Sequence, residues 1–167
     1  RRKPYVPSLI PVSMTDMVFM LPSVAGTILF PKLAVMICNQ EKWRFTKRVI
    51  FWITLVMLIL VTVSSFVAKP AVQLLFGKAF LPAIPAFVWL MPGIFILSIN
   101  LMFMNYFASI GMPLVTVYSP GIAALVNILL NMKLIPLYGI VGASISSSVS
   151  YGLMFIASLT YIAYRRR

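Results

Sequence analysis

The side chains that could do chemistry are few, and acids are the scarcest of them. Asp16 and Glu41 are the two acidic residues, Cys38 is the single cysteine, and histidine is absent. Catalytic sites use groups whose protonation can be tuned, typically histidine, cysteine or paired acids. Metal sites need clusters of the same side chains. We therefore expect no enzyme activity, no metal site and no cofactor.

Asp16 and Lys32 are charged residues within one apolar run, and we predict both as substrate-binding candidates. An acid in a membrane segment is costly and usually has a partner or a function. Asp16 could hold a coupling cation or orient a cationic residue; alternatively, it lies at the surface and caps the start of a helix. Lys32 could face a cavity and meet a pyrophosphate or acidic sugar, or extend to the membrane surface.

Asn100 and Asn105 lie inside a further apolar run, and Asn127 and Asn131 lie one helical turn apart in another. A buried amide in a bilayer must find a hydrogen bond. Each amide therefore either bridges to another helix or faces a wet cavity that can take sugar hydroxyls. We predict Asn100 and Asn105 as candidate substrate-binding residues, with helix bridging as the alternative.

Small residues recur along the last apolar run. Gly142, Ser146 and Ser150 are spaced one helical turn apart. This spacing lets the backbone of a neighbouring helix come close inside a membrane. We expect a helix-packing face, in which the serines can also bond carbonyls of their own helix. A polar pore lining is the alternative.

Prolines interrupt several apolar runs. Pro22, Pro92 followed by Gly93, and Pro120 each lie inside such a run. Proline removes a backbone hydrogen bond and bends a helix. We predict that these positions are hinges whose bend changes during a transport cycle.

Composition places the chain in a membrane. Hydrophobic residues make up 62% of its 167 residues and charged residues 10%, whereas soluble domains are roughly half apolar. A helix of about 20 apolar residues crosses a bilayer. We therefore predict an all-α, polytopic membrane bundle of about five transmembrane helices in a single domain at 1–167. The expected helices are at about 12–37, 49–68, 82–110, 114–132 and 140–164.

Charge predicts the orientation of this bundle. A net charge of +12 would favour nucleic acid in a soluble protein, but here most charges lie at the ends of apolar runs, where they meet lipid head groups. We expect membrane lipids as partners and no nucleic acid. The basic loop at 38–48 and the arginines at 165–167 predict a multi-pass protein of the cell membrane with a cytoplasmic C-terminus. The segment at 69–81 is too short to span the membrane and either lies at the interface or forms a short helix. This segment and a loop at 133–139 are then external.

Four stretches together carry a resemblance. They are NILLNMKLIPLYGIVGA at 127–143, LPSVAGTILFPKLA at 21–34, LLFGKAFLPA at 74–83 and NYFASIGMP at 105–113. In this order the chain resembles the C-terminal part of polysaccharide and O-antigen flippases, a branch of the multidrug/oligosaccharidyl-lipid/polysaccharide exporter superfamily. The resemblance implies the last five helices of a twelve-helix transporter, with the N-terminal half outside this sequence as a partner. It also implies structural roles for the two asparagines in 127–143.

The resemblance implies a flippase that moves a lipid-linked oligosaccharide to the external leaflet for polysaccharide biosynthesis, by alternating access. A sugar pyrophosphate cannot cross hydrocarbon unaided because its charges would lose their hydration. One alternative is a cation-coupled multidrug extruder of the same superfamily, which needs acids in its cavity. A second is a non-transporting scaffold subunit of a polysaccharide-synthesis complex, with the Gly142 stripe as its interface. A membrane transferase is a third, supported by hydrophobicity alone.

Overall fold

The computed structural model describes residues 9–75 and 77–165, and every regular element in that part of the chain is a helix. Five of these helices are long and apolar enough to cross a membrane. The prediction of an all-α membrane bundle is therefore confirmed. The elements are α1 (Leu9–Ala34), α2 (Asn39–Leu75), the short 3-10 helix η2 (Lys78–Ala83), α3 (Ile84–Ser109), α4 (Val115–Tyr138) and α5 (Ile140–Arg165).

The start of α1 corrects one interpretation of Asp16. The helix begins at Leu9 and not near position 12, so Asp16 lies about two turns inside it. A capping side chain must stand next to the first turn of a helix, where backbone N–H groups lack helical partners. The carboxylate of Asp16 therefore does not cap α1.

α2 is much longer than predicted. It begins at Asn39, so the basic stretch at 38–48 is helical apart from its first residue and does not form a loop. Neither proline nor glycine occurs between 39 and 69, so no residue stops the helix where the membrane ends. Its 37 residues extend about 55 Å, beyond the roughly 30 Å of a hydrocarbon core. At its other end α2 continues through Pro70 and so includes the first part of the segment predicted at 69–81. The last part of that segment belongs to the short helix η2.

The loop predicted at 133–139 is also mostly helical. α4 continues through Pro136 to Tyr138, and α5 begins at Ile140. The chain reverses at Gly139, which has a φ of 59° and donates its N–H to the carbonyl of Ile135 over 2.8 Å. Glycine ends a helix in this way because it adopts positive φ without a steric penalty. The turn between α4 and α5 is therefore a single residue.

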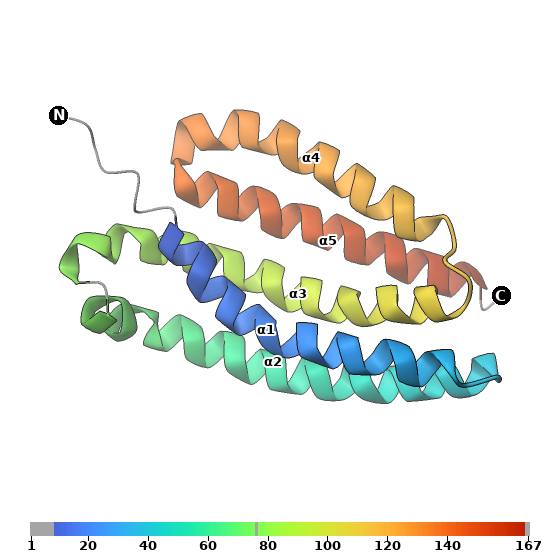
Figure 1. Cartoon of the computed structure of the whole chain (residues 1–167). Helices are drawn as coiled ribbons and strands as arrows, with labels where there is room; N and C mark the ends of the chain where they lie inside the picture. Colours follow the sequence, from blue (N-terminus) through green and yellow to red (C-terminus); the bar gives the residue numbers. More distant parts are fainter. Residues whose placement is uncertain (1–8, 76, 166–167) are drawn as a thin grey trace.

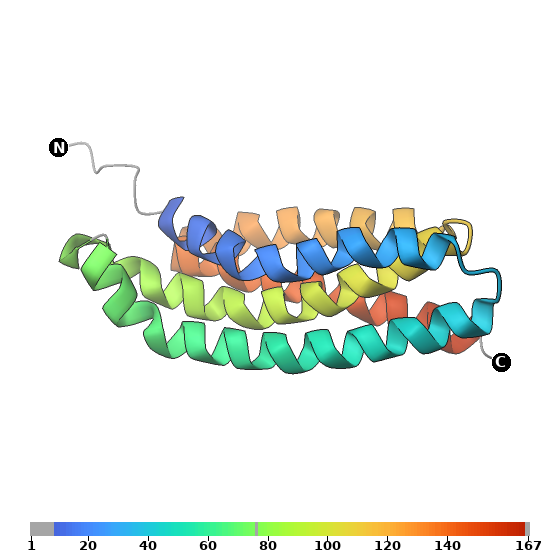
Figure 2. The same ribbon diagram turned by 60° about the horizontal axis from the view of Figure 1, so that its bottom comes forward.

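The five long helices alternate in direction, so the ends of α1, α3 and α5 lie beside the starts of α2 and α4 (Figure 1). α3 is central and packs against α1, α2 and α5. α4 packs almost entirely against α5. Figure 2 shows α1 and α4 on one side of α3 and α2 on the other. The two sides of the bundle are therefore bordered by different helices.

Gly93 allows α3 to approach α5 closely. A Cβ added there would lie 2.8 Å from the Cα of Ser148 on α5. Ser148 Oγ also donates to the carbonyl of Trp89 over 2.9 Å, in the turn that precedes Pro92. A serine from a neighbouring helix is one of the groups that make a proline tolerable inside a membrane helix. Pro92 and Gly93 therefore lie at a packing contact between α3 and α5.

One end of the bundle carries most of the positive charge, and we call it the basic end. The described cations there are Lys32, Lys42, Arg44, Lys47, Arg48 and Arg165. Lys42 is only 8% exposed, and its Nζ donates to the carbonyl of Ser109, the last residue of α3, over 2.7 Å. A cation at this position satisfies a terminal carbonyl and complements the negative end of the helix dipole. Lys42 therefore joins α2 to α3.

Candidate functional site

Asp16 and Lys32 lie on different faces of α1. Lys32 is about 24 Å further along the helix axis and about 160° around it. Its Nζ lies 4.8 Å from the centre of the Phe45 ring, in a cation–π contact with α2. Asp16 is exposed on the face turned away from α2. The two charges therefore do not form a single site.

Asn100 and Asn105 both lie at contacts between helices. Asn100 is fully buried between α3 and α5, where its Oδ1 accepts a hydrogen bond from Ser158 Oγ over 2.7 Å. Its Nδ2 has no hydrogen-bond partner among the described residues. Asn105 is half-buried against Gly26 of α1 and donates its Nδ2 to the carbonyl of Leu101 over 2.8 Å. In this conformation Asn100 is closed to a substrate.

A different set of polar residues shares one face of α1. Asp16, Ser23 and Thr27 are all exposed, and their spacing keeps them within about 20° of one line along the helix. Thr27 Oγ1 donates to the carbonyl of Val24 over 2.8 Å, which leaves its oxygen able to accept. Asp16 was predicted as a functional residue whereas Ser23 and Thr27 were not, although their periodicity is visible in the sequence.

A groove between α4 and α5 holds a second polar set. Its volume is about 370 Å³, and its lining includes Pro120, Asn127, Ser147, Ser150 and Tyr151. Asn131 Nδ2 donates to Asn127 Oδ1 over 2.8 Å, and Asn127 Nδ2 donates to Ser147 Oγ over 3.4 Å. The two amides therefore connect α4 to α5. Asn131 Oδ1 is buried and has no partner among the residues described here, and Asn131 itself does not line the groove.

This groove opens on the side of the bundle where α1 lies. On α5, the carbonyl of Met154 accepts a hydrogen bond from Ser119 of α4, and Ser148 bonds to α3. At about 100° per residue, Ser147 and Tyr151 fall between these two directions. The groove therefore opens into the angle between α4 and α3, and Figure 2 shows α1 on the same side of α3.

We call this side of the bundle the polar side. Its members are Asp16, Ser23 and Thr27 on α1, Asn127 on α4, and Ser147 and Tyr151 on α5. All of them lie in helices that can span a membrane, and all are exposed or half-buried. Of the four residues predicted to bind substrate, Asp16 alone belongs to it.

The predicted hinges occupy three different environments. Pro22 is buried, Pro92 is exposed beside the buried Gly93, and Pro120 lines the groove between α4 and α5. α1, α3 and α4 continue as helices through these prolines. A change of bend at these positions stays a prediction.

The stripe of small residues on α5 is occupied within the chain. Gly142, Ser146 and Ser150 are buried, and the backbone of Leu134 on α4 fills the space that a side chain on Gly142 would need. Ser146 and Ser150 donate to carbonyls one turn earlier on α5, over 2.9 and 2.8 Å. The scaffold alternative requires this stripe to be open to a partner protein. In this structure the stripe is instead covered within the chain.

Comparison with known proteins supports the prediction of a membrane protein but does not show its family or its function. No family model and no solved structure matches the chain. The chain is similar to the uncharacterized membrane protein MJ1068 of Methanocaldococcus jannaschii, with 26% identity over 146 residues that cover 82% of the chain. The chain spans 28% of the length of that relative. Together with the five long apolar helices, this similarity identifies a multi-pass membrane protein.

Proposed function

We propose that the chain is part of a flippase that moves a lipid-linked oligosaccharide across the cell membrane for polysaccharide biosynthesis. The polar side is the observation that carries this proposal. Its carboxylate and hydroxyl groups belong to exposed or half-buried residues of membrane-spanning helices. Such groups are unfavourable against lipid tails. The polar side therefore needs water, a polar ligand or polar protein against it.

The chemistry of the polar side suits the sugar part of such a substrate. The carboxylate of Asp16 accepts hydrogen bonds, and the hydroxyls of Ser23 and Ser147 both donate and accept. Sugar hydroxyls need partners of both kinds when they leave bulk water. In a transporter built from two repeats, the second half faces the first across the path and completes it. The N-terminal half of a flippase would occupy that position here.

The distribution of charge between the two ends of the bundle supports one orientation of the protein in the membrane. The basic end carries six described Lys and Arg residues against Glu41, whereas the opposite end carries Lys69, Lys78 and Lys133 together with Asp16. Cytoplasmic ends of membrane proteins are richer in Lys and Arg. In the proposed orientation, the basic end and the C-terminus lie in the cytoplasm.

Asp16 favours one alternative, a cation-coupled multidrug extruder of the same superfamily. A carboxylate exposed within a membrane span can bind a coupling cation or a cationic drug. The two functions differ in the charge of the cargo, because a lipid-linked sugar carries a pyrophosphate. Raised drug sensitivity in an Asp16→Asn strain, with oligosaccharide export intact, would favour the extruder.

Export assays with two variants of the full-length protein test the flippase proposal. We expect Asp16→Asn to lower export of lipid-linked oligosaccharide about tenfold, the effect of losing one hydrogen bond to a charged group. Lys32→Gln should leave export near that of the unchanged protein, because Lys32 contacts α2 and not the polar side. Membrane amounts of the three proteins must be matched. Equal export by all three would contradict the proposal.

A further inference from the structure

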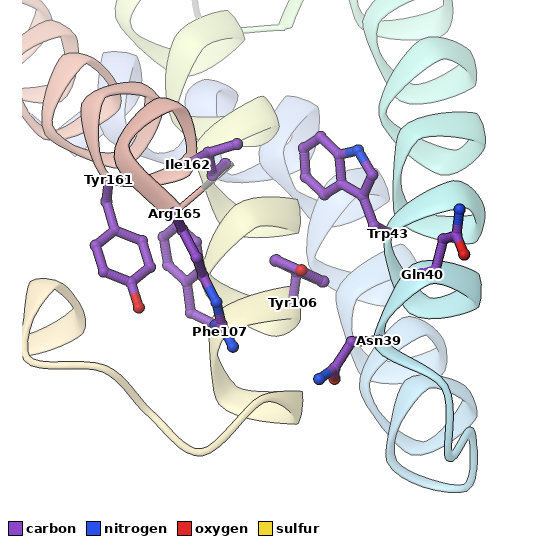
Figure 3. Close-up of a pocket in the computed structure, with 8 residues that line it drawn as sticks. All are labelled: Asn39, Gln40, Trp43, Tyr106, Phe107, Tyr161, Ile162 and Arg165. Carbon is purple, nitrogen blue, oxygen red and sulfur yellow. The ribbon is translucent and has the colours of Figure 1, made fainter. Parts of the chain in front are cut away.

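A pocket of about 240 Å³ lies at the basic end, where the start of α2 meets the ends of α3 and α5 (Figure 3). Aromatic side chains form much of its wall, and exposed polar side chains surround it. The aromatic residues include Trp43, Tyr106 and Phe107, and the exposed polar residues are Asn39, Gln40 and Arg165. The pocket therefore combines an apolar wall with polar groups from two helices.

The polar groups of this pocket favour an anion. Arg165 contributes a guanidinium, and the amide of Asn39 contributes N–H donors. The side chain of Gln40 extends to the far side of α2 (Figure 3). α2 begins at Asn39, so its first backbone N–H groups lack helical partners and carry the positive end of the helix dipole. None of the lining residues is acidic. Phosphate matches this set of donors, because guanidinium binds its oxygens in a bidentate manner.

An apolar groove adjoins the pocket and extends toward the middle of the bundle. Its volume is about 700 Å³, and it shares Trp43 and Ile162 with the pocket. Ile50 of α2 and Leu159 and Ala163 of α5 also line it. α2 and α5 both pack against α3 but have at most slight contact with each other in the described chain. The groove lies between them, away from the polar side.

We propose that an anionic phospholipid binds at the basic end, with its phosphate at Arg165 and one acyl chain in the groove. The pocket alone is smaller than the roughly 300–1,000 Å³ of sites for drug-sized ligands, so it suits a head group. Basic pockets between membrane helices bind such head groups. A phospholipid carries an anionic head and a long apolar chain in one molecule, which matches the pocket and the groove that continues from it.

Quenching of Trp43 by brominated lipids tests this site, because Trp43 borders both the pocket and the groove. A variant of the full-length protein that keeps Trp43 as its single tryptophan, with Trp52, Trp89 and any others replaced, is placed in phosphatidylcholine vesicles that contain phosphatidylglycerol. Bromine is carried on the chains of one lipid at a time. We expect stronger quenching by brominated phosphatidylglycerol than by brominated phosphatidylcholine at equal mole fraction.

Matched variants separate the two parts of the site. Arg165→Gln should weaken the apparent affinity for phosphatidylglycerol about tenfold. Arg48→Gln removes an exposed cation of the same end that lines neither cavity, so its effect should be at most about fivefold. Ala163→Phe should reduce quenching by filling the groove. Ile156→Phe, on an exposed part of α5 outside the groove, should not.

Three outcomes would overturn the proposal. Equal quenching by the two lipids would show that the site has no preference for an anionic lipid. Equal effects of Arg165→Gln and Arg48→Gln would show that the preference comes from the general positive charge of this end and not from the pocket. Loss of the phosphatidylglycerol preference in millimolar inorganic phosphate would assign the pocket to a soluble phosphate compound and not to a lipid.

Discussion

Replacing Gly93 with alanine is expected to destabilise the bundle by about 1–3 kcal/mol. The added Cβ would lie 2.8 Å from the Cα of Ser148 and 2.6 Å from its Oγ. A backbone atom cannot rotate out of the way, so α3 and α5 would have to separate. This separation would strain the hydrogen bond from Ser148 to Trp89, and α4 would be affected because it packs almost entirely on α5. Unfolding of the full-length protein in mixed micelles, followed by circular dichroism, measures the effect.

Gly121→Ala is the matched control, since it adds the same methyl group to another helix. A Cβ on Gly121 of α4 would have no neighbouring atom within 4 Å in the described structure. Alanine is favoured over glycine inside a helix by up to about 1 kcal/mol, so this variant should be neutral or more stable. Equal destabilisation by the two substitutions would show that close contact at Gly93 does not hold α3 against α5.

Under the proposed flippase function, replacing both Asn127 and Asn131 with leucine is expected to lower oligosaccharide export by about tenfold or more. Asn127 lines the groove and would contact the substrate, and Asn131 positions it by donating to its Oδ1 over 2.8 Å. Loss of both amides should reduce binding or transition-state stabilisation by roughly this factor. The leucine side chain has the same branching as asparagine and suits a membrane helix, so the protein should still insert. Export from cells with matched membrane levels of the full-length protein gives the measurement.

The bond between Asn127 and Ser147 also connects α4 to α5, so a structural effect must be separated from loss of substrate binding. Ser119→Ala removes another hydrogen bond between these helices, the one of 3.2 Å to the carbonyl of Met154. Ser119 is buried and does not line the groove. It should therefore lower stability slightly, by roughly 0.6 kcal/mol, and leave export unchanged. An equal fall in export from both variants would contradict a substrate-binding role for Asn127.

The fold could be predicted from the sequence because few structures satisfy long apolar runs in a membrane. Charged and turn-forming residues mark the ends of such runs only coarsely. The basic stretch at 38–48 was predicted as a loop from its charge, yet Lys and Arg are good helix formers, and the helix continues beyond the membrane. Pro136 suggested a loop at the end of α4, yet the helix continues past this proline and the chain reverses direction only at Gly139.

The candidate site could be predicted only in part, because it depends on which helices meet. Nothing in the sequence pairs Asn100 with Ser158 or Gly93 with Ser148, since these residues are far apart along the chain. The sequence likewise does not indicate that the ammonium group of Lys42 bonds to a carbonyl at the end of α3. The exposed line on α1 through Asp16 follows from helical periodicity alone, and a search by periodicity would have found it.

Labelling of single cysteines on α1 tests most directly whether the polar side lines a water-filled path. In full-length protein without Cys38 or any other cysteine, we expect Ser23→Cys and Thr27→Cys to react with a membrane-impermeant thiol reagent at least about tenfold faster than Val24→Cys and Ile28→Cys. Thiols react as thiolates, which form in water and not in lipid. All four positions are exposed in the bundle, but the latter two lie on an apolar face. Equal, slow labelling at all four would show that the polar side meets lipid or protein and would contradict the transport path.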